Sequence, residues 1–187
     1  MKRNRFGFFI YALVVCVGLS GFLFAARLVE DAEAINTIIP EKDTIEHDIV
    51  KLTPAVIAKI NKRAGYEKFT EANKELDFIV GKKDGKVIAV AVIDSEQGKW
   101  GQIDFMIAID PATSKVKDLV VLAFEEKRGR PIARRKFLEQ FIGKSASDPL
   151  EVNVNFEGIT GATISSKAAS QAILDTFVVY EEVYKKK

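Results

Sequence analysis

The longest apolar run of the chain lies near its N-terminus. None of the 21 residues at positions 6–26 has a charged side chain. An α-helix rises about 1.5 Å per residue, so this run would reach about 31 Å, which matches the hydrocarbon core of a bilayer. Lys2, Arg3 and Arg5 precede the run, and acidic residues follow it. The pattern predicts a single-pass transmembrane helix with the N-terminus in the cytoplasm and the main domain extracytoplasmic, or periplasmic.

The length of the run also distinguishes an anchor from a signal peptide. Signal-peptide cores usually have about 7 to 15 apolar residues, so an uncleaved anchor in the cytoplasmic membrane is predicted. A cleaved signal stays the alternative, because Ala32, Glu33 and Ala34 resemble a small-x-small cleavage site. The next residues, 28–53, are polar and mixed and predict a stalk. The predicted organisation is therefore a cytoplasmic N-terminus with anchor (1–27), a stalk (28–53) and one domain (54–187).

The periodicity of the outer domain predicts helices around an antiparallel sheet. Thr53 and Pro54 precede an amphipathic stretch that stops at Gly65, which indicates a short helix. Two β-rich runs, 76–80 and 87–93, flank an Asp84-Gly85 pair that is typical of a hairpin. Further strands are predicted at 102–109 and 116–124, a short helix at 136–144, a strand at 152–156 and a closing helix at 165–184. This order predicts an α+β domain with an antiparallel sheet packed by short helices.

Charge and rare residues exclude several classes of function. The net charge is +2, but four of the 28 basic residues lie within 1–27, so the remaining chain has 24 basic and 26 acidic side chains. No nucleic-acid partner is therefore expected. Cys16 is the only cysteine and lies in the apolar run, and His47 is the only histidine. These counts exclude a thiol nucleophile in the outer domain and a histidine-centred triad or zinc site.

Candidate chemistry gathers where the last predicted strand meets the last helix. Residues 157–166 read Glu-Gly-Ile-Thr-Gly-Ala-Thr-Ile-Ser-Ser. Glycine and alanine would let a ligand approach the backbone, hydroxyl groups are abundant, and the free N–H groups of a helix start favour a phosphate. The alternative is a glycine turn in which Ser or Thr caps the helix.

These residues resemble the flavinylation site of a known family. Thr-Gly-Ala-Thr followed by two serines and an alanine-rich helix is similar to the FMN-binding domain of Rnf complex G subunits and of the C subunits of sodium-translocating NADH:quinone reductases. The resemblance implies covalent FMN, joined by a phosphoester to Thr163. It also implies a flavin transferase that reads Asp-Gly-x-Ser/Thr-Gly-Ala-Thr, from which this chain departs by having Glu157. The cofactor-binding residues implied are Thr163, Ala162, Gly161, Thr160, Ser165, Ser166 and Glu157.

Two other places are candidates for contact with the flavin. The cationic loop after residue 124 predicts that Glu126, Arg128 and Gly129 line the flavin side of the pocket, with a solvated loop as the alternative. This loop differs from the Glu-Thr-Pro-Gly-Leu-Gly type of the named subunits and is more similar to stand-alone members of the family. Trp100 lies between glycines 98 and 101, where it would either cap the core or stack on the flavin.

The resemblance implies a membrane-anchored electron-transfer flavoprotein, an electron-transfer subunit of an oxidoreductase system rather than a complete enzyme. Its implied partners are a flavin transferase, membrane electron-transfer subunits or redox proteins, and the lipid bilayer. No general acid or base and no metal site are expected, because electron transfer requires none. Two alternatives stay open: a noncatalytic membrane-tethered binding or assembly module, and a flavin-dependent reductase of a small extracytoplasmic acceptor.

Overall fold

The computed structural model describes residues 26–70, 75–125 and 130–186. The predicted transmembrane run at 6–26 therefore lies almost wholly outside the described residues. Within the described ranges, no helix has both the length and the apolar character needed to cross a membrane.

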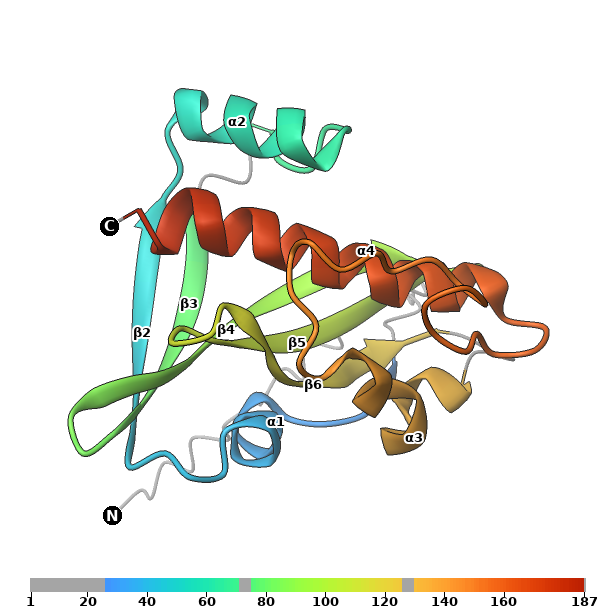
Figure 1. Cartoon of the computed structure of the whole chain (residues 1–187), viewed down its shortest axis with the longest axis horizontal. Coiled ribbons are helices and arrows are strands. Elements are labelled where there is room, and N and C mark those ends of the chain that lie inside the picture. The colour runs from blue at the N-terminus through green and yellow to red at the C-terminus, as the bar shows by residue number, and fades with distance from the viewer. Residues whose placement is uncertain (1–25, 71–74, 126–129, 187) are drawn as a thin grey trace, which may run out of the picture.

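The described chain is built on a six-stranded antiparallel sheet with the order β1-β6-β5-β4-β3-β2 (Figure 1). Its strands are β1 (Ala26–Arg27), β2 (Thr44–Lys51), β3 (Glu75–Lys83), β4 (Lys86–Gln97), β5 (Gln102–Asp110) and β6 (Lys115–Phe124). The predicted meander of four strands, β3 to β6, is confirmed. Asp84 and Gly85 have positive φ angles of 50° and 73° at the β3–β4 turn, as the hairpin signal requires.

The predicted stalk is wrong, because most of residues 28–53 belongs to the folded unit. The segment forms α1 (Asp31–Ile38) and then β2, which pairs with β3 from Thr44–Lys82 to Lys51–Glu75. Ala34, Ile38 and Ile39 are fully buried against the face of the sheet that lies away from α4. The polar appearance of the segment arises because α1 buries only one stripe and β2 is a half-exposed edge strand.

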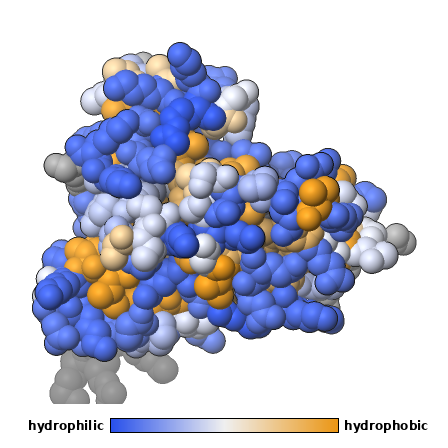
Figure 2. Space-filling view, in the orientation of Figure 1, coloured by the Kyte–Doolittle hydropathy of each residue, from blue (hydrophilic) through white to orange (hydrophobic). Residues whose placement is uncertain are grey.

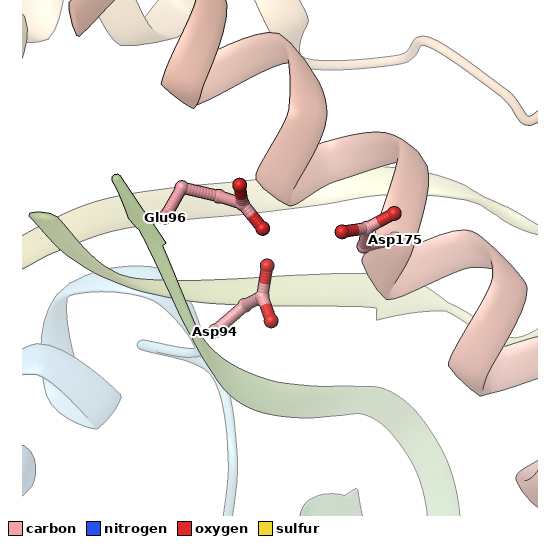
Figure 3. A group of neighbouring side chains, drawn as sticks. All are labelled: Asp94, Glu96 and Asp175. Carbon is pink, nitrogen blue, oxygen red and sulfur yellow. The ribbon is translucent and has the colours of Figure 1, made fainter. Parts of the chain in front are cut away.

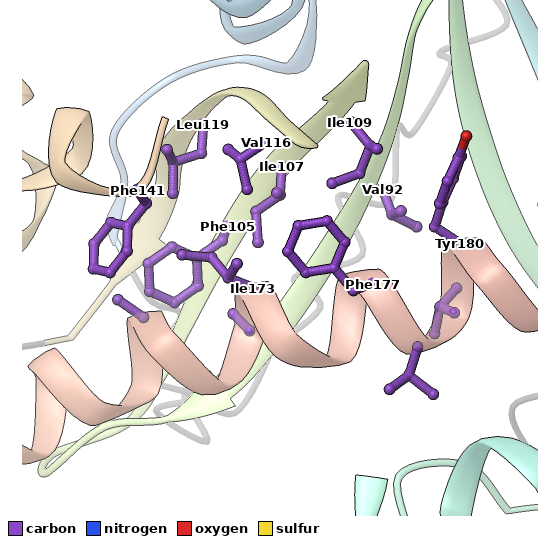
Figure 4. Close-up of a cluster of buried hydrophobic side chains, with 14 of the residues drawn as sticks. Val92, Phe105, Ile107, Ile109, Val116, Leu119, Phe141, Ile173, Phe177 and Tyr180 are labelled. Atoms are coloured by element: carbon purple, nitrogen blue, oxygen red, sulfur yellow. The ribbon is translucent and has the colours of Figure 1, made fainter. Parts of the chain in front are cut away.

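The main core lies between the sheet and the long helix α4 (Thr163–Val179) (Figure 4). Phe105, Ile107 and Ile109 alternate along β5 toward α4, where they meet Ile173 and Phe177. The chain continues from α4 as a π-helical turn, Tyr180–Tyr184, and α2 (Pro54–Ala64) lies against the outer side of α4. Thr53 caps α2 and Gly65 ends it with φ 82°, as predicted.

Short elements connect β6 to α4. They are η1 (Arg130–Ala133), α3 (Arg135–Leu138) and η2 (Glu139–Phe141). The predicted strand at 152–156 is instead a turn with one isolated bridge, Val152–Phe156. Asn153 takes a left-handed conformation at φ 62°, and its N–H donates to Phe156 O at 2.8 Å. Asparagine tolerates this conformation, so turn chemistry prevails over the apolar alternation.

Candidate cofactor-binding site

A tight turn delivers the chain into α4. Gly161 has φ +77°, a conformation that residues with a Cβ rarely adopt, and the Ala162 N–H donates to Ile159 O at 2.9 Å. Gly158 is needed for space, because a Cβ there would lie 2.5 Å from Val152 Cγ1. Thr163 follows as the first residue of α4, two residues before the predicted start, and its side chain is exposed.

Among the described residues, no side chain caps the start of α4. The N-cap residue is Ala162, and no cap hydrogen bond from a side chain accompanies it. The alternative of a Ser or Thr N-cap is therefore wrong for this helix. The first N–H groups of a helix have no intrahelical acceptor, and the helix dipole places partial positive charge there. The α4 start is thus chemically suited to an anion.

The two serines of the motif have different surroundings. Ser165 is 1% exposed, and its Oγ has no hydrogen-bond partner among the described residues. Ser166 is fully buried, and its Oγ accepts from Ile159 N at 3.0 Å and donates to Ala162 O at 3.1 Å. Ser165 consequently keeps an unused hydroxyl beside the α4 start, whereas Ser166 holds the turn together.

A pocket of about 240 Å³, here called the Thr163 pocket, adjoins the α4 start. Its lining residues are Lys99, Trp100, Gly161, Ala162, Thr163, Ile164 and Ser165. Trp100 comes from the β4–β5 turn, which Gly98 N closes onto Gly101 O at 2.8 Å. Trp100 is 53% exposed, so the interpretation that it caps the core is wrong. Lys99 Nζ lies 5.4 Å from the centre of the indole ring.

A second pocket of about 240 Å³, the Glu157 pocket, lies beside the preceding residues. Its lining residues are Pro131, Arg134, Lys136, Phe137, Gln140, Glu157, Gly158, Ile159 and Thr160. The structure thus divides the predicted residues: Glu157 and Thr160 line this pocket, whereas residues 161–163 and Ser165 line the Thr163 pocket. Ser166 lines neither of these two pockets. Glu126, Arg128 and Gly129 lie outside the described residues.

Exposed apolar area does not point to another site on the face drawn in Figure 2. Apolar side chains there form separate patches among hydrophilic ones. Single exposed apolar residues are normal on protein surfaces. The pockets beside the motif are therefore the better guide to function.

A cluster of charged residues packs under the other half of α4 (Figure 3). The carboxylates of Asp94, Glu96 and Asp175 approach one another, and Lys68 Nζ lies 2.6, 2.9 and 2.8 Å from them, in that order. The Lys68 side chain is 7% exposed, so the chain supplies its own cation at this point. Burial raises the pKa of Asp94 to about 7, although the Lys68 ammonium opposes the shift, and burial raises the pKa of Glu96 as well.

The segment that contains the Thr163 pocket is similar to known proteins. The model of the FMN-binding domain matches residues 98–177. The G subunit of the proton-translocating ferredoxin:NAD(+) oxidoreductase complex of Clostridium ljungdahlii is 31% identical over 115 residues, which cover 57% of this chain and 61% of that relative. The match therefore spans less than two thirds of that relative. The G subunit of the Na(+)-translocating ferredoxin:NAD(+) oxidoreductase complex of Acetobacterium woodii is 26% identical over 190 residues, 95% of this chain and 90% of that relative.

Two crystal structures share the fold. The C subunit of the Na(+)-translocating NADH-quinone reductase of Parabacteroides distasonis has a TM-score of 0.52 and 16% identity, and the alignment covers 73% of this chain and 76% of that one. NqrC of Shewanella oneidensis has a TM-score of 0.56 and 14% identity, with 81% and 87% covered. The fold is that of an α+β domain, and the α4 start is its candidate cofactor site. Residues 98–177 match the FMN-binding domain family, which confirms the predicted resemblance.

The residues present fit the phosphate of FMN. The uncapped α4 start offers N–H donors, Ser165 has a buried hydroxyl without a partner among the described residues, and Gly161 leaves the backbone approachable. Sequence reasoning missed Lys99, Lys136 and Gln140 as pocket residues. Lys99 was detectable beside Trp100 in the glycine-flanked turn, whereas Gln140 is brought to the motif only by the tertiary fold.

Proposed function

We propose that the chain is a membrane-anchored FMN-binding subunit of an electron-transport complex of the Rnf or Nqr type, with FMN held by a phosphoester to Thr163. One observation carries the proposal. Thr163 is exposed at the first position of α4, where no described side chain caps the helix. It shares a pocket with the Ser165 hydroxyl, which has no partner in the described part of the chain, and it lies within the segment that matches the FMN-binding domain.

Four residues of the Thr163 pocket receive a role. Thr163 Oγ supplies the ester oxygen, and the first N–H groups of α4 with the Ser165 hydroxyl donate to the phosphate. Gly161 allows the close approach, and Trp100 offers an aromatic surface to the ring system. Bound FMN accepts one or two electrons and so connects two-electron donors with one-electron carriers. The protein contributes tethering, orientation and control of the reduction potential.

The cellular setting rests on the sequence and on the relatives. The apolar run at 6–26 supports a single anchor in the cytoplasmic membrane, with the main domain extracytoplasmic. Covalent attachment suits that location, because a dissociated cofactor would be diluted away. The curated relatives are G subunits of ferredoxin:NAD(+) oxidoreductase complexes, which supports partner subunits in the membrane.

Attachment requires a flavin transferase as an additional partner and a flavin dinucleotide as the FMN donor. The pyrophosphate bond of the donor would break, the Thr163 oxygen would take the FMN phosphoryl group, and the nucleoside monophosphate would leave. In this proposal the transferase reads residues 157–163, with Glu157 in the place of the usual aspartate. Glu157 is exposed and lines its own pocket, which supports this role. Glu126, Arg128 and Gly129 stay predictions for the flavin side of the pocket.

The covalent bond is tested by co-expressing the full chain with a flavin transferase and measuring the intact mass after denaturation. The wild type is expected to gain the mass of FMN less water, and Thr163→Ala to gain nothing. Thr37→Ala serves as the control and should still carry flavin, because Thr37 is exposed on α1 and lies outside residues 157–163. No added mass on the wild type, beside an active transferase, would contradict covalent attachment.

Electron transfer is tested in membranes that contain the partner subunits. Membranes with the wild-type chain should support NAD+ reduction by reduced ferredoxin, and membranes with Thr163→Ala should lose at least about nine-tenths of that rate. Equal rates would remove this chain from the electron path. The purified flavinylated chain should not turn over small acceptors, and such turnover would favour the reductase alternative.

A further inference from the structure

Three successive N–H groups before the motif turn each donate to a side chain from a different part of the fold. Glu157 N donates to Gln140 Oε1 at 2.7 Å, Gly158 N to Asn153 Oδ1 at 3.0 Å, and Ile159 N to Ser166 Oγ at 3.0 Å. Residues 157–159, here called the motif arm, lie outside the six strands of the sheet. Side-chain oxygens therefore accept the backbone hydrogen bonds that carbonyl groups of a neighbouring strand would otherwise accept.

The three acceptors are themselves held in place. Gln140 Nε2 donates to Phe137 O at 3.1 Å and to Glu157 O at 3.3 Å. The Gln140 amide therefore forms hydrogen bonds with both the backbone N–H and the backbone C=O of Glu157. Asn153 lies in the turn that the 2.8 Å bond from its N–H to Phe156 O closes. Phe137, Phe141 and Phe156 pack together beside them, with ring centroids 4.8 to 6.1 Å apart. Gln140, Asn153 and Ser166 are here called the clamp. The packed aromatic rings support the first two of these residues.

Ser166 connects the motif arm to the α4 start. Its Oγ accepts from Ile159 and donates to the carbonyl of Ala162, the residue just before Thr163. These two bonds link the motif arm to the residue that precedes Thr163. Without the clamp, the three N–H groups would turn to water and the direction of Glu157 relative to Thr163 would vary.

We infer that Gln140, Asn153 and Ser166 are positioning residues for the modification of Thr163. They hold the motif arm so that the Glu157 carboxylate and the Thr163 hydroxyl reach the modifying enzyme in a fixed relation. This inference rests on the proposed function. It assigns to Ser166 a role different from the direct cofactor contact that the sequence predicts.

The test measures how fast a flavin transferase modifies variants of the full chain, with initial rates by intact mass and kcat and KM calculated per folded molecule. Ser166→Ala should lower kcat about tenfold or more, because Thr163 is misplaced, and Gln140→Ala should raise KM about tenfold. Ser170→Ala is the matched control, since Ser170 lies one turn further along α4 and its Oγ donates to Lys167 O within α4. Gln140→Glu keeps the acceptor for Glu157 N and should restore part of the loss.

A second readout needs no activity. Amide hydrogen exchange of Ile159 in unmodified protein should speed up at least about tenfold in Ser166→Ala and stay unchanged in Ser170→Ala. If the wild type is flavinylated, and Ser166→Ala and Gln140→Ala have the same kcat and KM as Ser170→Ala, the inference is overturned. The proposed function would then still stand. A wild type that takes up no flavin would contradict the proposed function, and the inference with it.

Discussion

The two halves of α4 bury polar groups in opposite ways. At its start, N–H groups and the Ser165 hydroxyl face a pocket without protein partners among the described residues. Further along, Asp175 meets Lys68 and the two other carboxylates, and Gln171 and Tyr66 donate to it as well. Asp94 Oδ2 has no partner in the described part of the chain, and the raised pKa of this carboxyl lets a proton neutralise it. The half around Asp175 has its own cation in Lys68, and only in this sense we call it the closed half; the α4 start leaves N–H donors for a ligand, and we call it the open half.

Removing the internal cation gives the largest expected change in stability. Lys68→Met would leave three carboxylates, one buried and two partly buried, without their ammonium, at a cost of about 3–5 kcal/mol in the free energy of unfolding. Urea denaturation near neutral pH measures this loss. Lys51→Met is the control, because the Lys51–Glu75 pair is 83% and 58% exposed and contributes less than about 1 kcal/mol. Equal losses in both variants would show that the cluster is not the closed site described above.

The same cluster should make stability depend on pH. The pKa of Asp94 is raised from 3.8 to about 7, so its stabilising contribution is complete below pH 3.8 and is lost as the pH rises toward 7. The slope amounts to at most about 1.4 kcal/mol per pH unit. Asp94→Asn should flatten the stability curve between about pH 4 and 7. The comparison uses urea midpoints of both proteins across that range, and parallel curves would contradict the shift.

At the open half we expect a smaller change in stability, whose sign depends on whether FMN is attached. Ser165→Ala removes a hydroxyl that has no partner among the described residues, so unmodified protein should be unchanged or up to about 1 kcal/mol more stable. In the proposed flavinylated form the hydroxyl would bind the phosphate, and the variant should then be less stable than the wild type by about 1 kcal/mol. Thermal unfolding of both forms measures the difference. A stability loss already present before flavinylation would show that Ser165 is a structural residue.

Local signals in the sequence predict much of this fold. Asp84-Gly85 fixes a hairpin, Thr53 and Gly65 bound α2, and the residues of the motif indicate the α4 start, because each signal acts on neighbouring backbone. The missed part depends on distant contacts. Ile39 is buried because it packs over Gly81, and a Cβ at Gly81 would come within 2.9 Å of it.

Some residues of the candidate site are likewise indicated by local sequence signals, and others are brought there only by distant contacts. Thr163 is indicated by a contiguous motif, and Trp100 by its glycine-flanked turn. Nothing local connects Lys68 with Asp94 and Asp175, or Gln140 with Glu157, because those partners meet only when the strands and α4 assemble. The alternation at residues 152–156 predicted a strand because it carries no information on the turn that Asn153 adopts.

The most direct test of the open half is to locate the flavin by tandem mass spectrometry. The full chain is co-expressed with a flavin transferase and digested, and peptides that include residues 157–167 are fragmented. We expect the added FMN phosphate on Thr163 alone. Flavin found on Thr160 or Ser165, or none beside an active transferase, would contradict the claim that the α4 start presents Thr163 for covalent FMN.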